Sequence, residues 1–325
     1  MNILRLLVPL FSLAVAAAQP SPQPAPAPIV PLREGWAIQS SAKVTATGEA
    51  ISSPSFKTIL QNQDWMQADV PTTVVAAQVK NGLLPDPLYA MNLRQYLGVG
   101  YPAGSNFSNL PMPPDSPYAV SWWYRKEFTL PDVYAGKTVW LNFRGINYRA
   151  NVFLNGKQIA NSNEVAGAWR TYEFNVTSAL KPETNVLAVQ VWAPSENSLA
   201  ITFVDWNPAP PDKNMGLWRE VYLTASGPVA LRHPAVVSKV DSPANNEAHL
   251  TVTALVKNVD DSPVKGTLKG RIENIAFEQP VELGAGESKD VVFSPDRYPQ
   301  LNLSNPRLWW PAQMGTPNLY ELHLS

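Results

Sequence analysis

The feature that most restricts the possible folds is the alternation of apolar and polar residues in short runs after Pro117. A period of two is typical of β-strands that bury one face. Asn155-Gly156 lies between two apolar runs and predicts a tight hairpin turn. Many short strands with hardly any helical pattern predict an all-β domain over residues 33–227, a β-sandwich or jelly roll. The runs are 122–128, 139–143, 152–159, 170–176, 186–192 and 220–223.

The pattern before Pro117 is less regular. Residues 65–74 predict a strand that ends at a proline, and residues 73–80 predict a short helix. Asn81-Gly82 is a typical helix end, because both residues tolerate left-handed backbone. Residues 97–117 form a long segment rich in Gly, Pro, Asn and Ser, for which we expect a loop.

A second set of strand patterns follows Pro228. About seven strands over roughly 95 residues is the size of an immunoglobulin-like sandwich. We therefore expect a second β-sandwich domain over residues 228–325. The chain has no cysteine, so no disulfide joins its sheets, and no thiolate metal site or cysteine nucleophile is possible. The patterns are 236–240, 249–256, 266–272, 289–293 and 319–324.

The N-terminal residues indicate export. Residues 1–18 contain Arg5, an apolar run and a small-residue cleavage site, which is typical of a secretory signal peptide. The apolar run is too short to span a membrane. Residues 19–32 alternate proline with small residues and predict an extended linker. We expect a secreted, extracellular protein with glycosylation sequons at Asn106, Asn175 and Asn302.

Charge excludes one class of partner. The formal net charge is −1 and no basic stretch is present, so we expect no nucleic-acid partner. The three histidines are scattered without the spacing of metal ligands, and we expect no metal and no cofactor.

Residues 204–219 fit neither a helix nor a strand, because three prolines fall within four positions. The stretch also contains Asp205, Trp206, Trp218 and Arg219. Indole faces beside carboxylates and amides provide the surface that sugar recognition requires. Alternatively, the tryptophans only fix the loop onto a sandwich. For Trp218 and Arg219 we favour this alternative, through the indole and a buried ion pair.

This stretch, V-D-W-N-P-A-P-P-D-K-N-M-G-L-W-R, resembles a signature of the exo-β-glucosaminidase group of glycoside hydrolase family 2. Four other segments also resemble family motifs, and the resemblance covers nearly everything after Trp36. They are V-P-T-T at 70–73, P-D-P-L-Y at 85–89, G-I-N-Y-R-A at 145–150 and L-W-W-P at 308–311.

The resemblance implies a jelly-roll sugar-binding domain and an immunoglobulin-like domain, followed in the family by a (β/α)₈ barrel that carries both catalytic carboxylates. The 325 residues show no βα alternation and have no room for the roughly 250 residues of such a barrel. We therefore predict the non-catalytic N-terminal region of a secreted exo-β-glucosaminidase-like enzyme, inactive alone, with no catalytic residue among these positions.

The resemblance also implies substrate contacts. We expect Asp205 to accept hydrogen bonds from sugar hydroxyls and Trp206 to form a wall of the terminal-sugar pocket. Asp86 and Asn92 are further candidates, although Asp86 has the alternative role of capping its turn. The expected partners are a glucosamine-type oligosaccharide of the chitosan type and the missing barrel.

Two other functions remain open. The chain could be a stand-alone carbohydrate-binding or adhesion protein without catalysis. It could also be a β-mannosidase-like fragment, but β-mannosidases resemble W-D-W-G-P at the position of the proline-rich stretch, which favours the glucosaminidase.

Overall fold

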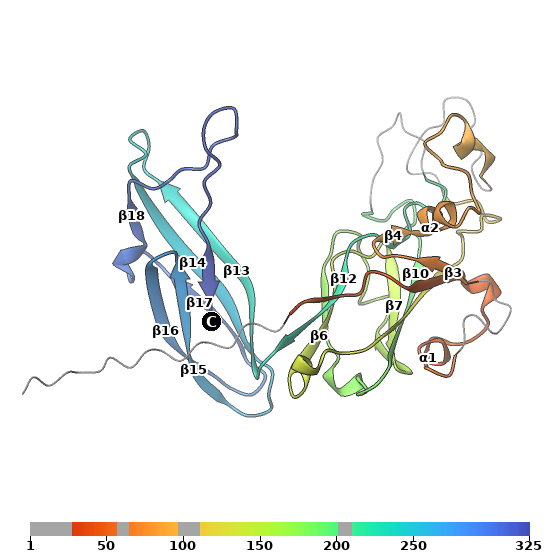
Figure 1. Cartoon of the computed structure of the whole chain (residues 1–325), viewed down its shortest axis with the longest axis horizontal. Coiled ribbons are helices and arrows are strands. Elements are labelled where there is room, and N and C mark those ends of the chain that lie inside the picture. The colour runs from red at the N-terminus through yellow and green to blue at the C-terminus, as the bar shows by residue number, and fades with distance from the viewer. Residues whose placement is uncertain (1–27, 57–64, 97–110, 201–209) are drawn as a thin grey trace, which may run out of the picture.

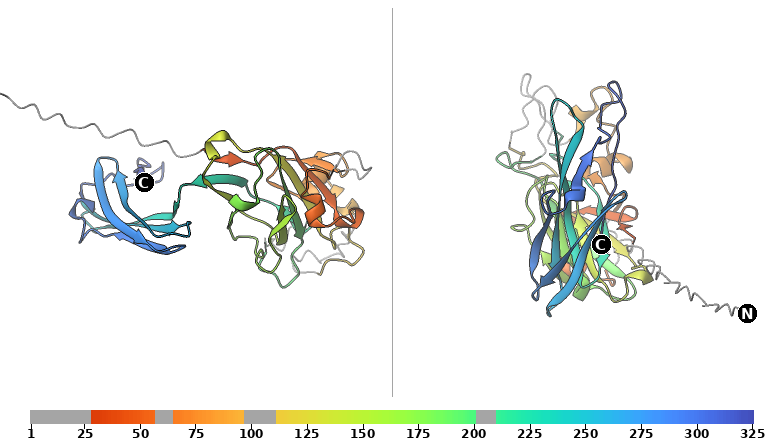
Figure 2. Two further views of the ribbon diagram at one scale, coloured as in Figure 1. Left: turned by 90° about the horizontal axis from the view of Figure 1, so that it is seen from below. Right: turned by 90° about the vertical axis from the view of Figure 1, so that its left-hand side faces the viewer.

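The structure is a computed structural model that describes residues 28–56, 65–96, 111–200 and 210–325. The chain folds into two β-sandwiches, which Figures 1 and 2 show as separate bodies joined at one narrow point. The predicted all-β class is thus confirmed. None of the helices in the described ranges has the length and apolar character needed to cross a membrane. The expected signal peptide, residues 1–18, lies outside the described residues.

The first sandwich has one sheet of six strands in the order β3-β2-β5-β10-β7-β8 and one of four strands in the order β1-β12-β6-β9. A separate two-stranded ladder pairs β4 with β11. The strands are β1 Val30–Pro31, β2 Trp36–Ser40, β3 Met66–Ala68, β4 Thr72–Thr73, β5 Trp122–Phe128, β6 Thr138–Phe143, β7 Arg149–Leu154, β8 Lys157–Ala160, β9 Tyr172–Asn175, β10 Asn185–Trp192, β11 Gly216–Leu217 and β12 Val221–Ser226.

The strand β10 lies in the middle of the larger sheet and is covered on both faces. Leu187 and Val189 point into the core between the two sheets. Ala188 points to the other face, where it packs with Trp123 and Phe153 beneath the short helix α1, Gly48–Ile51. A strand that is buried on both faces needs apolar residues at almost every position, which explains the apolar run of this segment.

Two local predictions are confirmed. Asn155 and Gly156 have φ of 52° and 86° and join β7 to β8, as expected of an Asn-Gly hairpin. The predicted helix is α2, Val74–Lys80, whose N-cap Thr73 accepts a hydrogen bond from the backbone of Ala76. It ends at Asn81 and is followed by Gly82 at φ 70°.

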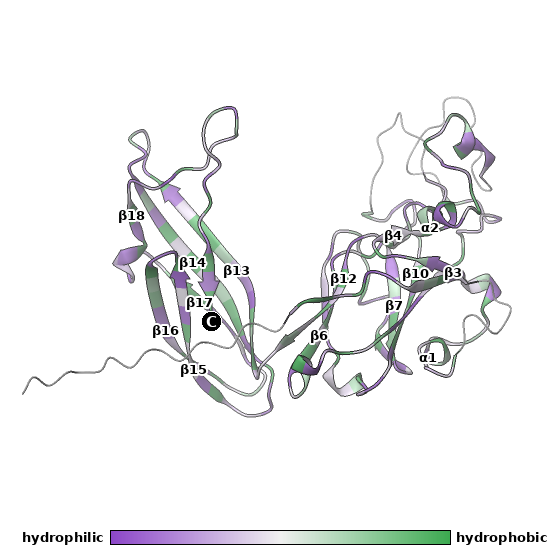
Figure 3. Cartoon of the chain, in the orientation of Figure 1, coloured by the Kyte–Doolittle hydropathy of each residue, from purple (hydrophilic) through white to green (hydrophobic). Residues whose placement is uncertain are grey.

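The second sandwich pairs the sheet β13-β14-β17, to which β18 adds beside β14, with the sheet β16-β15-β19. Phe277, Phe293 and Leu301 are buried between them. Buried and half-buried positions alternate along β14, which Figure 3 shows as bands of colour. The strands are β13 Val229–Val240, β14 Glu247–Asn258, β15 Val264–Ile272, β16 Ile275–Leu283, β17 Ser288–Phe293, β18 Asn302–Ser304 and β19 Leu322–Leu324.

The last residues of the expected linker, 19–32, are part of the first sandwich. Val30 and Pro31 pair with β12, and the backbone N–H of Leu32 donates to Val221 over 2.9 Å. Leu32 is also buried, and its carbonyl accepts a hydrogen bond from the indole of Trp36. Residues 30–32, which we expected in the linker, therefore belong to the first sandwich.

The joint between the sandwiches consists of Gly227 and Pro228, because β12 ends at Ser226 and β13 begins at Val229. Side chains of the second sandwich contact Trp140 of β6 across this joint. The Arg232 guanidinium lies 4.8 Å and the Lys257 ammonium 5.3 Å from the indole ring. Arg232 also forms an ion pair of 2.7 Å with Glu173. Stacked cations and a partly buried ion pair thus link the two bodies.

Candidate functional site

Three segments that are far apart in the sequence meet beside α2, at the upper end of the first sandwich in Figure 1. We call residues 72–75, 145–148 and 212–217 the junction. β4 and β11 pair so that Thr73 lies opposite Gly216, and Gly216 exchanges two backbone hydrogen bonds with Asn147, of 2.9 and 2.7 Å. Three of the five segments that resemble family motifs, at 70–73, 145–150 and 204–219, are thus joined by hydrogen bonds in one unit.

Gly216 lies at the centre of the junction, at a position where only glycine fits. Its φ is 148°, and a Cβ at this position would lie 2.4 Å from the Tyr124 hydroxyl and 2.6 Å from the Thr72 carbonyl oxygen. Real Cβ atoms do not approach oxygen atoms this closely. The glycine therefore lets three backbones come together where any side chain would separate them.

Asp212 is completely buried below the junction. Its Oδ2 accepts a hydrogen bond of 2.8 Å from the backbone of Val75, in the first turn of α2, and its Oδ1 accepts one of 2.9 Å from Asn214. Burial raises the pKa of Asp212 to about 6, although these hydrogen bonds oppose the shift. A carboxyl group without solvent access cannot touch a substrate, so we assign Asp212 to structure.

Asn147 holds the turn that follows Asp212. Its Nδ2 donates to the carbonyls of Lys213 and Asn214, over 2.9 and 2.8 Å. Both acceptors belong to residues with left-handed backbone, at φ 49° and 58°. Asn147 is itself fully buried, and its amide supplies donors to one carbonyl of a buried residue, Lys213, and one of a half-buried residue, Asn214.

Trp218 anchors the end of the proline-rich stretch, as predicted. Its indole N–H donates to the Ala168 carbonyl over 2.9 Å, and its ring meets Trp169 edge-on with 4.8 Å between centroids. The predicted buried ion pair of Arg219 is wrong. Arg219 is exposed, and its guanidinium lies 5.5 Å from the Trp218 ring centre. The indole face takes the place of the expected carboxylate.

The structure brings together two of the four predicted substrate contacts. The Asp86 carboxylate accepts a hydrogen bond of 2.9 Å from the backbone of Leu88, and the Asp86 carbonyl accepts one of 3.0 Å from the Asn92 side chain. The first of these bonds is the turn-capping role that we considered for Asp86. Asp205 and Trp206 lie outside the described residues, so their roles stay predictions.

The turn that contains Asp86 also exposes large apolar side chains. Leu88 is 93 % exposed and Tyr89 is 72 % exposed, and Leu83 and Met91 beside them are exposed as well. Apolar groups gathered on one exposed turn are typical of a contact surface.

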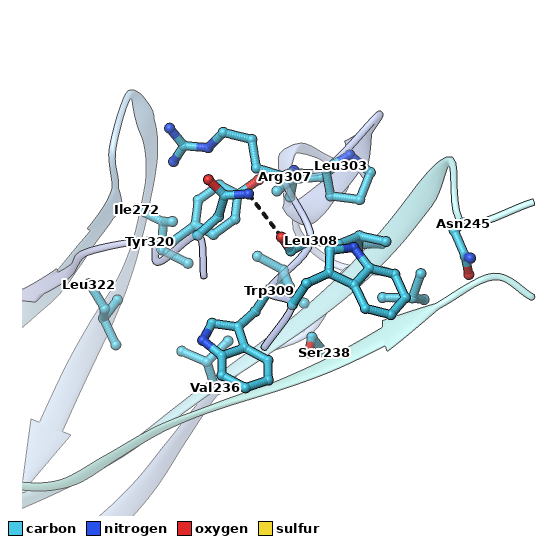
Figure 4. A pocket seen from close by; sticks show the side chains of 16 residues that line it. Val236, Ser238, Asn245, Ile272, Leu303, Arg307, Leu308, Trp309, Tyr320 and Leu322 are labelled. Atoms are coloured by element: carbon cyan, nitrogen blue, oxygen red, sulfur yellow. Dashed lines mark hydrogen bonds between the residues drawn. The ribbon is translucent and has the colours of Figure 1, made fainter. Parts of the chain in front are cut away.

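A groove of about 490 Å³ lies on the second sandwich (Figure 4). Trp309 of the L-W-W-P segment stands beside the strand β13 at Val236 (Figure 4), and Trp310 also lines the groove. The Asn318 side chain donates to the Leu308 carbonyl over 2.9 Å and thereby fixes the segment. The groove offers indole surface for contact and, apart from Arg307, no charged group for chemistry.

Asp241, Glu247 and His249 form the one cluster in the described ranges whose ligand atoms would suit a metal ion, all within 4.8 Å of one another. The two carboxylates are exposed, and the histidine contacts Asn302 at 2.6 Å and Asp241 at 3.5 Å. The Asn302 hydrogen bond raises the pKa of His249. Hydrogen bonding at the surface explains the cluster. Its two carboxylates are solvent-exposed and therefore do not form the enclosed site that a glycosidase requires.

The two described sequons differ in how their amide groups are used. The Oδ1 of Asn175 accepts hydrogen bonds from the backbone and hydroxyl of Thr177. The Nδ2 of Asn302 donates to the carbonyls of Pro295 and Pro299, over 3.2 and 2.9 Å. Asn106 lies outside the described residues.

Comparison with known families identifies both sandwiches. Residues 117–203 match the model described as the glycosyl hydrolase 2 galactose-binding domain-like family, and residues 229–325 match glycosyl hydrolases family 2. These matches fit the jelly-roll and immunoglobulin-like domains that the sequence predicts.

The similar curated proteins are much longer than this chain. The exo-β-D-glucosaminidase of Streptomyces avermitilis is 38 % identical over 90 % of this chain and 30 % of its own length. A mannosylglycoprotein endo-β-mannosidase of Lilium longiflorum is 28 % identical over 90 % of this chain and 32 % of its own length. The crystal structure of the Amycolatopsis orientalis exo-chitosanase superimposes with a TM-score of 0.73 and 29 % identity, over 92 % of this chain and 33 % of that one. The chain therefore spans about a third of the length of these relatives.

Proposed function

Because the chain carries the galactose-binding-like domain and the following sandwich of glycosyl hydrolase family 2, we propose that it is the non-catalytic, substrate-facing N-terminal region of a secreted exo-β-glucosaminidase-like enzyme. The substrate class is a glucosamine-type oligosaccharide. The support for this class is the similarity to exo-β-D-glucosaminidases along 90 % of the chain.

The observation that carries the proposal is the junction. Family-like motifs at 70–73, 145–150 and 212–219 are not separate resemblances, since their backbones bond to one another around Gly216. The buried carboxylate of Asp212 and the buried amide of Asn147 hold the turn at residues 212–214, within the proline-rich stretch. A rigid base is what a loop needs in order to present side chains to a ligand.

On this base we assign Asp205 to accept hydrogen bonds from sugar hydroxyls and Trp206 to cover the apolar face of the ring. Asp86 and Asn92 are further contacts on the neighbouring turn. The acid/base and the nucleophile come from a (β/α)₈ barrel, because a retaining glycosidase needs two enclosed carboxyl groups about 5 Å apart. The apolar side chains of residues 83–91 provide a surface for that barrel to cover.

The test joins this chain to the remainder of the Streptomyces avermitilis exo-β-D-glucosaminidase in place of the matching N-terminal third. The chain alone is expected to give no turnover of p-nitrophenyl β-D-glucosaminide, and the chimera is expected to hydrolyse it. In the chimera, Asp205→Ala and Trp206→Ala should each lower kcat/KM by about ten-fold or more. The exposed Asn163→Ala serves as the matched control. Turnover by the chain alone, or site variants as active as the control, would overturn the proposal.

Two alternatives have their own support. The exposed indoles of Trp309 and Trp310 favour a stand-alone carbohydrate-binding protein, which requires heat on titration with glucosamine oligomers at millimolar concentration and its loss in Trp309→Ala. The similarity to the Lilium longiflorum endo-β-mannosidase favours a mannoside. Preference of the chimera for a p-nitrophenyl β-D-mannoside would select that alternative.

A further inference from the structure

Aromatic and cationic side chains gather on the first sandwich next to the junction. Three segments form this surface, which we call the indole surface: residues 148–149, 166–170 and 218–219. The backbone N–H of Gly167 donates to the Tyr148 carbonyl over 3.2 Å, and Arg149 lies opposite Ala166 in a β-bridge. The segments are therefore fixed to one another by backbone hydrogen bonds, as the junction is.

Trp169 is the exposed member of a pair of indoles. It is 64 % exposed, whereas Trp218, which meets it edge-on, is half-buried. The hydrogen bond from the Trp218 indole to the Ala168 carbonyl holds this support beside Trp169. Trp169 thus presents indole surface to solvent from a fixed base, and the apolar face of a sugar ring can pack on such a surface.

Three arginines adjoin the indole pair, and each is held against an aromatic ring. The distance from the guanidinium carbon to the ring centre is 5.9 Å for Arg149, 5.1 Å for Arg170 and 5.5 Å for Arg219. Arg149 and Arg170 each also donate one N–H to a backbone carbonyl, over 3.0 and 3.2 Å. A guanidinium group that is already held in place loses little conformational freedom when it binds a carboxylate.

The indole surface has more positive than negative charge, although the formal net charge of the whole chain is −1. None of the ion pairs in the described ranges includes Arg149, Arg170 or Arg219. Two exposed glutamates adjoin these arginines, and one of them, Glu164, accepts a hydrogen bond from the backbone of its own turn. The other is Glu220. The guanidinium groups are therefore available to an anionic ligand.

The combination of indole and guanidinium groups favours one class of anion. A free phosphate or sulfate ion would use the arginines alone, and an acidic peptide has no need of an exposed indole. A uronate ring uses both, because its apolar face packs on the indole and its carboxylate accepts two N–H groups from an arginine. Glucosamine units carry an ammonium group instead, which the arginines repel.

We propose that the indole surface is a binding site for an acidic oligosaccharide that contains uronate units. One ring packs on Trp169, and its carboxylate pairs with Arg170 or Arg219. Arg149 adds a third cation and attracts the neighbouring acidic unit. This site is distinct from the expected substrate contacts at Asp205, and it requires neither the barrel nor hydrolysis.

The test titrates the full chain at low salt with three trisaccharides of different charge and measures binding by calorimetry. They are the trimers of galacturonate, N-acetylglucosamine and glucosamine. The galacturonate trimer is expected to bind about ten-fold or more tightly than the N-acetylglucosamine trimer, and the glucosamine trimer more weakly still. Added salt should weaken the binding of the galacturonate trimer.

Trp169→Ala and Arg170→Gln should each weaken binding of the galacturonate trimer by about five-fold or more. The matched controls, Trp309→Ala and Arg271→Gln, lie on the second sandwich and should leave it unchanged. Trp309 is likewise an exposed indole, at 58 %, and Arg271 likewise donates an N–H to a backbone carbonyl. Because all four side chains are exposed, the variants should melt at the temperature of the wild type.

Three results would overturn the inference. The first is binding of the galacturonate trimer by the two site variants that equals binding by the wild type. The second is binding of either glucosamine-type trimer as tightly as the galacturonate trimer. The third is equally tight binding of hexaglutamate, which would make the indole surface a contact for acidic proteins. None of these measurements involves glycoside hydrolysis, so their outcome is independent of the chimera assay.

Discussion

The carboxylate of Asp212 and the backbone N–H of Val75 are joined by a hydrogen bond of 2.8 Å, although 137 residues separate them in the sequence. Val75 lies in the first turn of α2, where N–H groups have no partner within the helix. The carboxylate supplies that partner and at the same time fixes the turn that follows residue 210. One buried side chain thus joins the helix to the proline-rich stretch.

The unfolding free energy of the chain should depend on the ionisation of the buried Asp212 carboxyl group. Burial raises the folded-state pKa of Asp212 from 3.8 to about 6. The protonated form is therefore favoured by folding, and the contribution is fully present below pH about 4 and lost as the pH rises through about 6. We expect the unfolding free energy of the wild type, relative to Asp212→Asn, to fall by up to about 3 kcal/mol from pH 4 to 7.

Urea unfolding of both proteins at pH 4, 5.5 and 7 measures this difference. Asp212→Asn cannot ionise, so it removes this titration while the other carboxylates remain. A difference that grows with pH would mean that the two backbone hydrogen bonds outweigh burial.

Asn147→Ala should destabilise the first sandwich by about 2–4 kcal/mol. The substitution removes the hydrogen bonds from the buried Asn147 amide to the carbonyls of Lys213 and Asn214 and leaves these carbonyls without that partner. Asn163→Ala, at an exposed turn, should change the stability by less than about 0.5 kcal/mol. Chemical denaturation of the wild type and the two variants measures these differences. Equal stabilities would show that the junction does not depend on the Asn147 amide.

Gly216→Ala tests the close approach of backbones. The added methyl group would lie 2.4 Å from the Tyr124 hydroxyl, and φ of 148° is unfavourable for alanine. We expect a loss of about 3 kcal/mol or more, through strain and overpacking. Gly227→Ala meets nothing within 4 Å and should be neutral to within about 0.5 kcal/mol. Thermal unfolding by circular dichroism compares the two, and similar melting temperatures would contradict the packing at Gly216.

Glycan occupancy should differ between the two described sequons when the chain is made in a eukaryotic secretory host. The Asn302 nitrogen donates to two backbone carbonyls, and a glycan on that nitrogen would replace at least one of these bonds. The hydrogen bonds of Asn175 to Thr177 use its side-chain oxygen instead. We expect Asn175 to be occupied more than Asn302, measured by mass spectrometry of the peptides, with Thr177→Ala as the control. Higher occupancy at Asn302 would refute this expectation.

Local signals predicted the elements that are determined locally. The alternation at 122–128 became β5, the Asn-Gly pair became the turn from β7 to β8, and Thr73 with Asn81 delimits α2. The strand β16 was not predicted, because Pro280 interrupts its pattern. The sheet tolerates Pro280 because β16 is an edge strand, where a missing N–H leaves no neighbouring strand unpaired.

Contacts between residues that lie far apart in the sequence could not be predicted from such local signals. Resemblance singled out the segments of the junction, but nothing in their order indicates that Asp212 reaches Val75 or that Asn147 reaches Lys213. The signal that could have found Asp212 is an acid that directly follows Pro211 in a stretch that fits neither a helix nor a strand. The error at Arg219 has a similar cause. The sequence does not distinguish an arginine that contacts an indole ring from one that forms an ion pair with a carboxylate.

The passage from β12 to β13 has a mechanical consequence. Pro228 is held to the second sandwich, since its carbonyl accepts a hydrogen bond of 2.9 Å from Val259, which leaves Gly227 as the pivot. Rotation about the backbone of that residue would change the angle between the two sandwiches. The contacts of Arg232 and Lys257 with Trp140 oppose such a rotation, because it would separate these cations from the indole ring.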